Sequence, residues 1–107
     1  NIQQRSLDKL KFIITFTNEH LEESISIRQI ASAGYFSESH FMKFFKTHMG
    51  ISYIHYLNDV RLAHARNLLV STNLSILEIA QKSGFENASY FNRKFKDKYG
   101  ITPRQAR

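Results

Sequence analysis

The sequence predicts an all-α protein of about seven helices, with two helix-turn-helix subdomains joined by a long central helix. Three observations lead to this prediction. Segments typical of β-strands are nearly absent, helix-capping residues recur at regular intervals, and one motif of two short helices occurs twice. The chain has 107 residues, and a repeat of about 45 residues would be only marginally stable alone. The two repeats therefore need a shared element to pack against.

The repeated motif runs from an Ile-Ala pair to a Gly-Ile-Ser or Gly-Ile-Thr triplet, over residues 30–52 and again over residues 79–102. Aligned through Gly34 and Gly84, the copies are offset by 50 residues, whereas their Ile-Ala pairs are offset by 49. This alignment places one extra residue in the turn of the second copy. A short helix, a glycine turn and a second helix with basic residues together describe a unit that can bind DNA.

The first helix is predicted to begin at Ser6, whose hydroxyl can cap it. Its apolar residues recur at helical spacing, as expected for a helix with one buried side. Phe12 and Phe16 lie one turn apart on the opposite side, where they form either a second packing face or an exposed patch for a missing domain. The residues expected on the buried side are Leu7, Leu10, Ile14 and Leu21.

Matching caps begin the helices of the two copies. Ser26 and Ser75 are each followed three residues later by Gln or Glu, which is the pattern of a capping box. The helices that they begin should end before Gly34 and Gly84, where glycine can adopt a positive φ. The remaining helix limits are expected at Ser37, Gly50, Asn87, Gly100 and Thr102-Pro103.

Between the copies, residues 53–70 are predicted to form one helix. Its apolar side chains occupy a band wider than a single packing face needs, so both copies can pack on it. At ~1.5 Å per residue it spans roughly 27 Å, compared with ~34 Å between successive major-groove faces of B-DNA. The chain is therefore expected to form one domain over residues 1–107, divided into a first subdomain (6–51), a connecting helix (52–71) and a second subdomain (72–107). The apolar band comprises Tyr53, Leu57, Val60 and Leu68 on one side and Leu62, Ala65 and Leu69 on the next.

Arg61 falls within this apolar band, where an unpaired guanidinium would be costly. We expect a structural role in which Arg61 pairs with a carboxylate of the second copy, with Glu78 as the preferred partner. A contact of Arg61 with DNA is the alternative.

Positive charge is concentrated in the part of the chain that follows residue 36. The net charge is +6, while residues 1–36 carry four basic and four acidic side chains and are neutral overall. This distribution favours a polyanionic partner. Lys94 and Lys98 lie outside the surface proposed next and are expected only to aid solubility.

The second helix of each copy presents a polar stripe opposite a pair of phenylalanines, Phe41 and Phe45 or Phe91 and Phe95. Such side chains suit contacts with DNA, because Arg can donate two hydrogen bonds to guanine, Asn can pair with adenine and Met can contact a thymine methyl group. The base-reading residues are expected to be Ser39, Met42, Lys43, Ser89, Asn92 and Arg93, and the DNA backbone contacts Ser37, Lys46, Asn87 and Lys96. We call Ser39, Met42, Lys43 and Lys46 the first polar stripe, and Ser89, Asn92, Arg93 and Lys96 the second polar stripe.

Together these residues resemble the AraC/XylS family of bacterial transcription regulators. The resemblance covers nearly the whole chain and is strongest over residues 61–104, which include Glu78-Ile79-Ala80, Gly84-Phe85, Ser89-Tyr90-Phe91 and Gly100-Ile101-Thr102-Pro103. It implies a seven-helix domain with both recognition helices in adjacent major grooves of promoter DNA. It also implies activation of transcription through contact with RNA polymerase, and a sensory or receiver domain on the N-terminal side. The base-reading positions of the family fall on the residues named above.

This sequence departs from the family pattern at two places. Tyr53 stands where the family often has proline, and Met42 and Lys43 stand where polar side chains and arginine are common. Because lysine lacks the rigid fork of arginine, the first copy is expected to be the less base-selective.

Other classes of function fit the sequence less well. There is no cysteine, and the five histidines lack the spacing of a metal site, so neither a catalytic centre, a metal nor a cofactor is expected. No apolar run approaches the ~20 residues of a membrane span. A protein-interaction module or a basic helix on a membrane surface is the other alternative, but neither explains two matching polar stripes. The chain does not begin with Met, and we expect part of a longer, cytoplasmic regulator.

Overall fold

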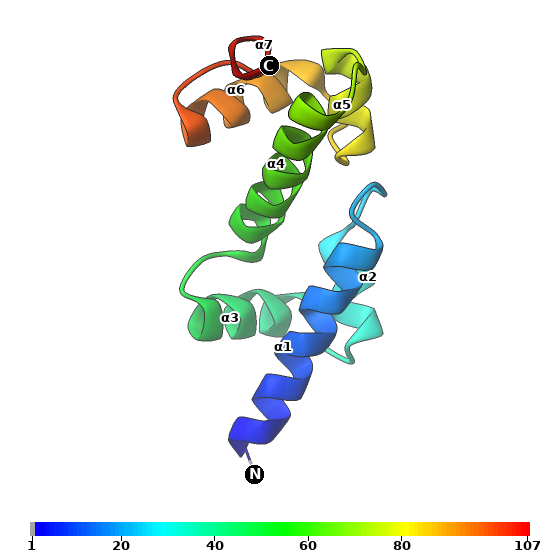
Figure 1. Cartoon of the computed structure of the whole chain (residues 1–107). Helices are drawn as coiled ribbons and strands as arrows, with labels where there is room; N and C mark the ends of the chain where they lie inside the picture. Colours follow the sequence, from blue (N-terminus) through cyan, green and yellow to red (C-terminus); the bar gives the residue numbers. More distant parts are fainter. Residues whose placement is uncertain (1) are drawn as a thin grey trace. The chain divides into compact units, whose positions relative to one another are not determined.

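The computed structural model describes residues 2–107, with side chains described from Gln4 onward; Asn1, which the predicted domain includes, lies outside the described residues. Over this range the chain forms seven helices and no strand, which confirms the predicted all-α class (Figure 1). The helices are α1 (Ile2–Glu19), α2 (Ile27–Ala33), α3 (Glu38–Met49), α4 (Tyr53–Ser71), α5 (Ile76–Lys82), α6 (Ala88–Tyr99) and α7 (Pro103–Ala106).

The helices belong to two compact units. Unit 1 comprises the residues up to Leu21 together with Ile25–Tyr56, and therefore contains α1, α2, α3 and the first turn of α4. Unit 2 comprises Glu22–Ser24 and Leu57–Arg107, and contains the rest of α4 with α5, α6 and α7. Each unit thus holds one copy of the repeated motif.

The core of unit 1 is built around aromatic rings. Phe41 and Phe45 of α3 are fully buried, and the ring of Tyr53 meets them edge-on at centroid distances of 5.1 and 5.2 Å. The buried Thr17 hydroxyl donates to the Ile13 carbonyl oxygen over 2.8 Å. Because its proton is used there, it accepts the hydrogen bond of the Tyr53 hydroxyl over 2.7 Å. The first turn of α4 is therefore part of this core, in agreement with the wide apolar band predicted for the central helix.

Helix α1 differs from the prediction in its start and in its buried side. It begins at Ile2, so Ser6 lies inside the helix and the predicted cap at Ser6 is wrong. Its fully buried residues are Ile13 and Thr17, whereas Leu7 is 51% exposed. An analysis of apolar spacing does not place Thr17 in the core, because its side chain is polar. Its two hydrogen bonds nevertheless allow it to be buried. The other residues expected on the buried side, Leu10, Ile14 and Leu21, are half-buried.

The two phenylalanines on the other flank of α1 lie partly within unit 1. Phe12 is 38% exposed, and its ring is close enough to Gly34 that a Cβ atom at Gly34 would lie 3.4 Å from it. Phe16 is half-buried and its ring centroid lies 4.3 Å from that of His20. The proximity of Phe12 to Gly34 favours the second packing face over an exposed patch, whereas Phe16 and His20 are neighbours one helical turn apart.

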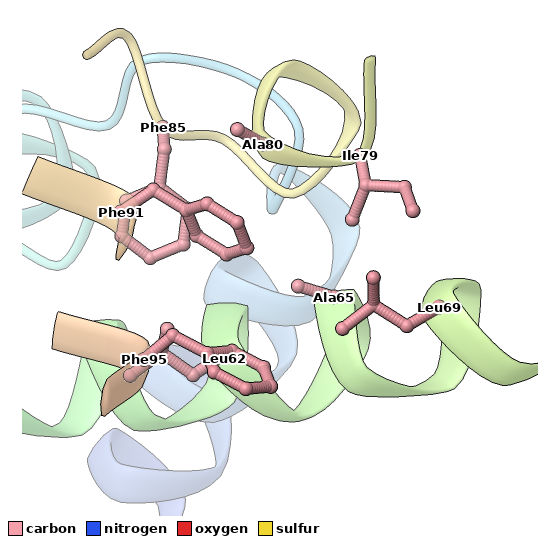
Figure 2. Close-up of a cluster of buried hydrophobic side chains, with 8 residues drawn as sticks. All are labelled: Leu62, Ala65, Leu69, Ile79, Ala80, Phe85, Phe91 and Phe95. Atoms are coloured by element: carbon pink, nitrogen blue, oxygen red, sulfur yellow. The ribbon is translucent and has the colours of Figure 1, made fainter. Parts of the chain in front are cut away.

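The core of unit 2 joins three helices through aliphatic and aromatic side chains (Figure 2). Helix α4 contributes side chains that the apolar band predicted, and α6 contributes two fully buried phenylalanines. The buried cluster comprises Leu62, Ala65, Leu69, Ile79, Ala80, Phe85, Phe91 and Phe95.

The turn between the two helices of each copy corrects the predicted register of the repeat. Gly34 has φ −95°, so it does not adopt the positive φ expected for it. The residue with positive φ is Tyr35, at 62°, and its counterpart in unit 2 is Gly84, at 88°. Gly34 therefore corresponds to the helix cap Ser83 rather than to Gly84.

The same correspondence continues to the next residue of the turn. The backbone N–H of Phe36 donates to the Ala31 carbonyl over 2.8 Å, and that of Phe85 donates to the Ala80 carbonyl over 2.9 Å. Both rings are buried. The 49-residue offset thus extends through Phe85, and the extra residue of the second copy is Glu86, which directly precedes the cap of α6.

The predicted caps begin five of the helices. Ser75 forms a complete capping box, because its hydroxyl accepts from the Glu78 N–H and the Glu78 carboxylate accepts from the Ser75 N–H. Ser26 accepts from the Gln29 N–H over 3.0 Å. The other caps are Ser37 for α3, Asn87 for α6, Thr102 with Pro103 for α7, and the left-handed Gly50 and Gly100 at the ends of α3 and α6.

Arg61 is 9% exposed, and its hydrogen bond to Glu23 lies within unit 2. Its guanidinium donates to the carbonyl oxygen of Glu23 over 2.7 Å. Ser24, which follows Glu23 in the chain, donates a hydrogen bond from its hydroxyl to the Glu86 carboxylate at a distance of 2.8 Å. A short segment between α1 and α2 is therefore held on unit 2, and the buried guanidinium has a structural role. The pairing of Arg61 with Glu78 stays a prediction.

Candidate nucleic-acid interface

The first polar stripe lies on α3 of unit 1, on the side away from Phe41 and Phe45. The two buried phenylalanines direct one side of the helix into the core. Residues on the opposite side of the helix therefore face outward. Met42 differs from the prediction because it is half-buried. The exposed members of the stripe are Ser39, Lys43 and Lys46.

The second polar stripe lies on α6 of unit 2, opposite the fully buried Phe91 and Phe95. Its residues occur at positions i, i+3, i+4 and i+7, so they lie on one face of the helix. The structure leaves all of them exposed, in contrast to the half-buried Met42 of the first copy. These residues are Ser89, Asn92, Arg93 and Lys96.

The two helices that carry the stripes begin with polar N-caps. The Ser37 hydroxyl oxygen accepts from the His40 N–H at a distance of 3.1 Å, and the side-chain amide oxygen Oδ1 of Asn87 accepts from the Tyr90 N–H at 2.9 Å. Each cap uses only an oxygen acceptor, so the hydroxyl proton of Ser37 and the amide protons of Asn87 are not consumed by it. Hydrogen-bond donors at a helix N-terminus suit an anionic partner such as a phosphate group.

The surroundings of the cationic residues differ between the two stripes. The Cζ atom of Arg93 lies 5.5 Å from the ring centroid of Tyr90. Within the part of the chain that the structure describes, no aromatic ring lies beneath the ammonium group of Lys43, the residue at the same position of the first stripe. Arg93 is thus the more constrained of the two side chains.

Two lysines expected only to aid solubility have specific contacts instead. Lys98 forms an ion pair with Asp59 of α4 over 3.2 Å. The ammonium group of Lys94 lies 5.6 Å from the ring centroid of Tyr90. Sequence spacing could not reveal the first contact, because its partners are 39 positions apart. The second contact has the ordinary helical spacing of four residues.

Neither a membrane span nor a metal site is found in the described part of the chain. None of its helices is long and apolar enough to cross a bilayer. Across residues 2–107, histidine, aspartate and glutamate side chains form no group of three that could hold a metal ion.

Comparison with protein families gives a match over most of the chain. A family model described as a helix-turn-helix domain matches residues 30–107. The regulatory protein PocR of Salmonella typhimurium is 34% identical over 99 residues, which cover 92% of this chain and 33% of PocR. The chain therefore spans a third or less of the length of the curated regulators it matches.

Solved structures of domains from bacterial regulators have a similar fold. The C-terminal domain of the two-component response regulator yesN from Fusobacterium nucleatum is 33% identical, with a TM-score of 0.89 over 94% of this chain and 98% of that domain. The DNA-binding domain of the global transcriptional factor AdpA, solved in complex with a target DNA, is 25% identical, with a TM-score of 0.83 over 87% of this chain and 84% of that one.

Further matching structures are described as AraC-type or AraC family regulators. The matched residues include both helices of the second copy and nearly all of the first. The chain belongs to the AraC family, and it is a helix-turn-helix DNA-binding domain of a bacterial transcription regulator rather than an enzyme.

Proposed function

We propose that this chain recognises a specific promoter sequence by placing α3 and α6 in successive major grooves of double-stranded DNA. The observation that carries the proposal is the repeated stripe: in each unit, polar and cationic side chains are exposed opposite two fully buried phenylalanines. The structure of AdpA with its target DNA supports duplex DNA as the partner.

Within this proposal, six residues read bases and four contact the DNA backbone. Arg93 donates to guanine, Asn92 pairs with adenine, and the lysines at the ends of the stripes lie against phosphates. The half-buried Met42 offers only part of its side chain to a thymine methyl group. The proposed base-reading residues are Ser39, Met42, Lys43, Ser89, Asn92 and Arg93, and the backbone contacts are Ser37, Lys46, Asn87 and Lys96.

The functional division follows the repeat: residues 6–51 form the first reading subdomain, 52–71 the connecting helix and 72–107 the second. Helix α4 has 19 residues, which corresponds to ~28 Å at ~1.5 Å per residue. It supplies Tyr53 to the core of unit 1 and Leu62, Ala65 and Leu69 to that of unit 2. A helix shared in this way is suited to hold two recognition helices at the spacing of neighbouring grooves.

The whole regulator is proposed to act in the cytoplasm as a transcription activator that contacts RNA polymerase. Its sensory or receiver domain lies on the N-terminal side of this domain. The similarity to the C-terminal domain of the response regulator yesN supports this arrangement, as does the small share of PocR that the chain covers.

Selection of duplexes from a random-sequence pool tests the proposal. Two unlike readers in one chain should select two different blocks, one helical turn (about 10 base pairs) apart and in direct rather than palindromic order. Recovery of a single block, or of no preferred sequence, would contradict recognition by both units.

A binding comparison separates this function from that of a basic membrane-surface protein. The chain should bind the selected duplex with a steep dependence on salt concentration. Vesicles with the same concentration of anionic charge serve as the control. If the chain binds the vesicles and shows no preference among duplexes, the result would favour a function at a membrane surface over recognition of DNA.

A further inference from the structure

Tyr90 lies between the core of unit 2 and the second polar stripe. It is half-buried on α6, and its ring centroid lies 6.2 Å from that of the buried Phe85. At the other end of the side chain, its hydroxyl accepts a hydrogen bond from the Asn58 side-chain amide of α4 over 2.9 Å. The ring is therefore held at both ends, by the core and by a neighbouring helix.

The guanidinium of Arg93 lies over this fixed ring. Its Cζ atom is 5.5 Å from the ring centroid of Tyr90, which is within the ~6 Å range of a cation–π contact. A guanidinium in cation–π contact keeps N–H groups able to donate to a base. An arginine held over a ring also samples fewer rotamers before it binds, so less conformational entropy is lost when it pairs with guanine.

We propose that Tyr90 is a positioning residue for Arg93. Tyr90, held by Asn58, keeps the guanidinium in place on the second polar stripe and thereby raises the base selectivity of α6. This inference rests on the proposed base-reading role of Arg93 and names the residue that makes its side chain selective.

The first unit has no equivalent arrangement among its described residues. His40 stands at the position of Tyr90, is exposed, and has its ring centroid 4.9 Å from that of Phe36. Lys43, at the position of Arg93, has no ring beneath its ammonium group in the described structure. Among the described residues the positioning therefore belongs to the second unit, where the planar guanidinium can use it.

Binding to two duplexes tests the inference. One is the selected duplex, and the other differs at the base pair whose preference Arg93→Ala abolishes. The ratio of the two affinities should fall about two- to fivefold in Tyr90→Leu, which removes the ring face. Tyr90→Phe and Asn58→Ala keep a ring but remove the hydrogen bond that anchors it, so both should lower the ratio by less.

Tyr99→Leu is the matched control. Tyr99 is also half-buried on α6, its ring centroid lies 4.7 Å from that of Phe95, and the Arg66 guanidinium lies 4.9 Å from its centroid. It lies outside the second polar stripe. Tyr99→Leu should leave the affinity ratio unchanged, even where urea unfolding shows a loss of stability as large as that of Tyr90→Leu.

Base pairs whose preference survives in Arg93→Ala distinguish positioning of Arg93 from general loosening of the fold. Tyr90→Leu should leave the preference at those base pairs unchanged. An unchanged ratio in folded Tyr90→Leu would overturn the inference, and Asn58→Ala gives the same test if Tyr90→Leu does not fold. If Arg93→Ala itself leaves base preference unchanged, the base-reading role of Arg93 fails instead.

Discussion

Arg93 and Lys43 occupy the same position of the two polar stripes, and their chemistry differs. The guanidinium of Arg93 can donate two parallel hydrogen bonds to O6 and N7 of guanine, whereas the ammonium of Lys43 is a compact point charge. Both side chains are exposed. We therefore expect unit 2 to discriminate between bases more strongly than unit 1.

Replacement of Arg93 by alanine measures this discrimination. Arg93→Ala should cost ~1–3 kcal/mol of binding free energy on the selected duplex, because the bidentate contact with guanine is lost. It should also relax the preference at one base pair, and Lys43→Ala should relax preference less. Fluorescence anisotropy titrations with selected and scrambled duplexes check this result. Equal losses on both duplexes would show that Arg93 does not read a base.

The lysines at the ends of the stripes should behave differently. Lys46→Ala and Lys96→Ala should weaken binding to all duplexes by similar factors, because a phosphate contact carries no sequence information. Each should also reduce the slope of log affinity against log salt concentration by about one. Lys11→Ala is the control, since Lys11 is exposed on α1 outside both stripes. A loss confined to the selected duplex would contradict a backbone contact.

At the residue scale, the sequence predicted which side chains of a regular helix are exposed. It did not predict hydrogen bonds from side chains to distant backbone carbonyl groups. The exposure of Ser89, Asn92 and Arg93 follows from helical spacing relative to Phe91 and Phe95. In contrast, Arg61 binds the carbonyl oxygen of Glu23, 38 positions away, and every residue carries such a carbonyl. No residue type in the sequence marks that partner.

Helix ends were predictable wherever a cap and a glycine agree. Helix α6 begins after the Asn87 cap and ends at Gly100, whose φ is 80°. The start of α1 and the register of the turns were not predictable in the same way. Tyr35 adopts a positive φ that only glycine and a few polar residues commonly take, so alignment of the two glycines misplaced the extra residue.

The glycine that ends α6 gives a test of this account of helix termination. A Cβ atom at Gly100 would meet nothing within 4 Å, so Gly100→Ala should be destabilising through left-handed backbone strain alone. We expect a loss of ~1–2 kcal/mol in the free energy of unfolding measured with urea. Gly100→Asn should lose less, because asparagine tolerates this conformation. Equal stability of Gly100→Ala and the natural chain would contradict the account.

At the scale of the whole molecule, the chain passes between the two units three times. Residues 22–24 belong to unit 2 although the segments on both sides of them belong to unit 1, and α4 contributes to both units. The need for a shared element was predictable from the small size of each repeat and the wide apolar band of the central helix. The contribution of residues 22–24 was not, because their contacts use one backbone carbonyl and two ordinary polar side chains.

Hydroxyl-radical footprinting of the chain on its selected duplex shows whether both units bind DNA at once. We expect two protected segments on one face of the duplex, with centres about 10 base pairs apart, because each recognition helix occupies one major groove. Arg93→Ala should weaken protection of the segment bound by unit 2. Protection of one segment only would mean that a single unit binds, and would contradict recognition by two helices in successive grooves.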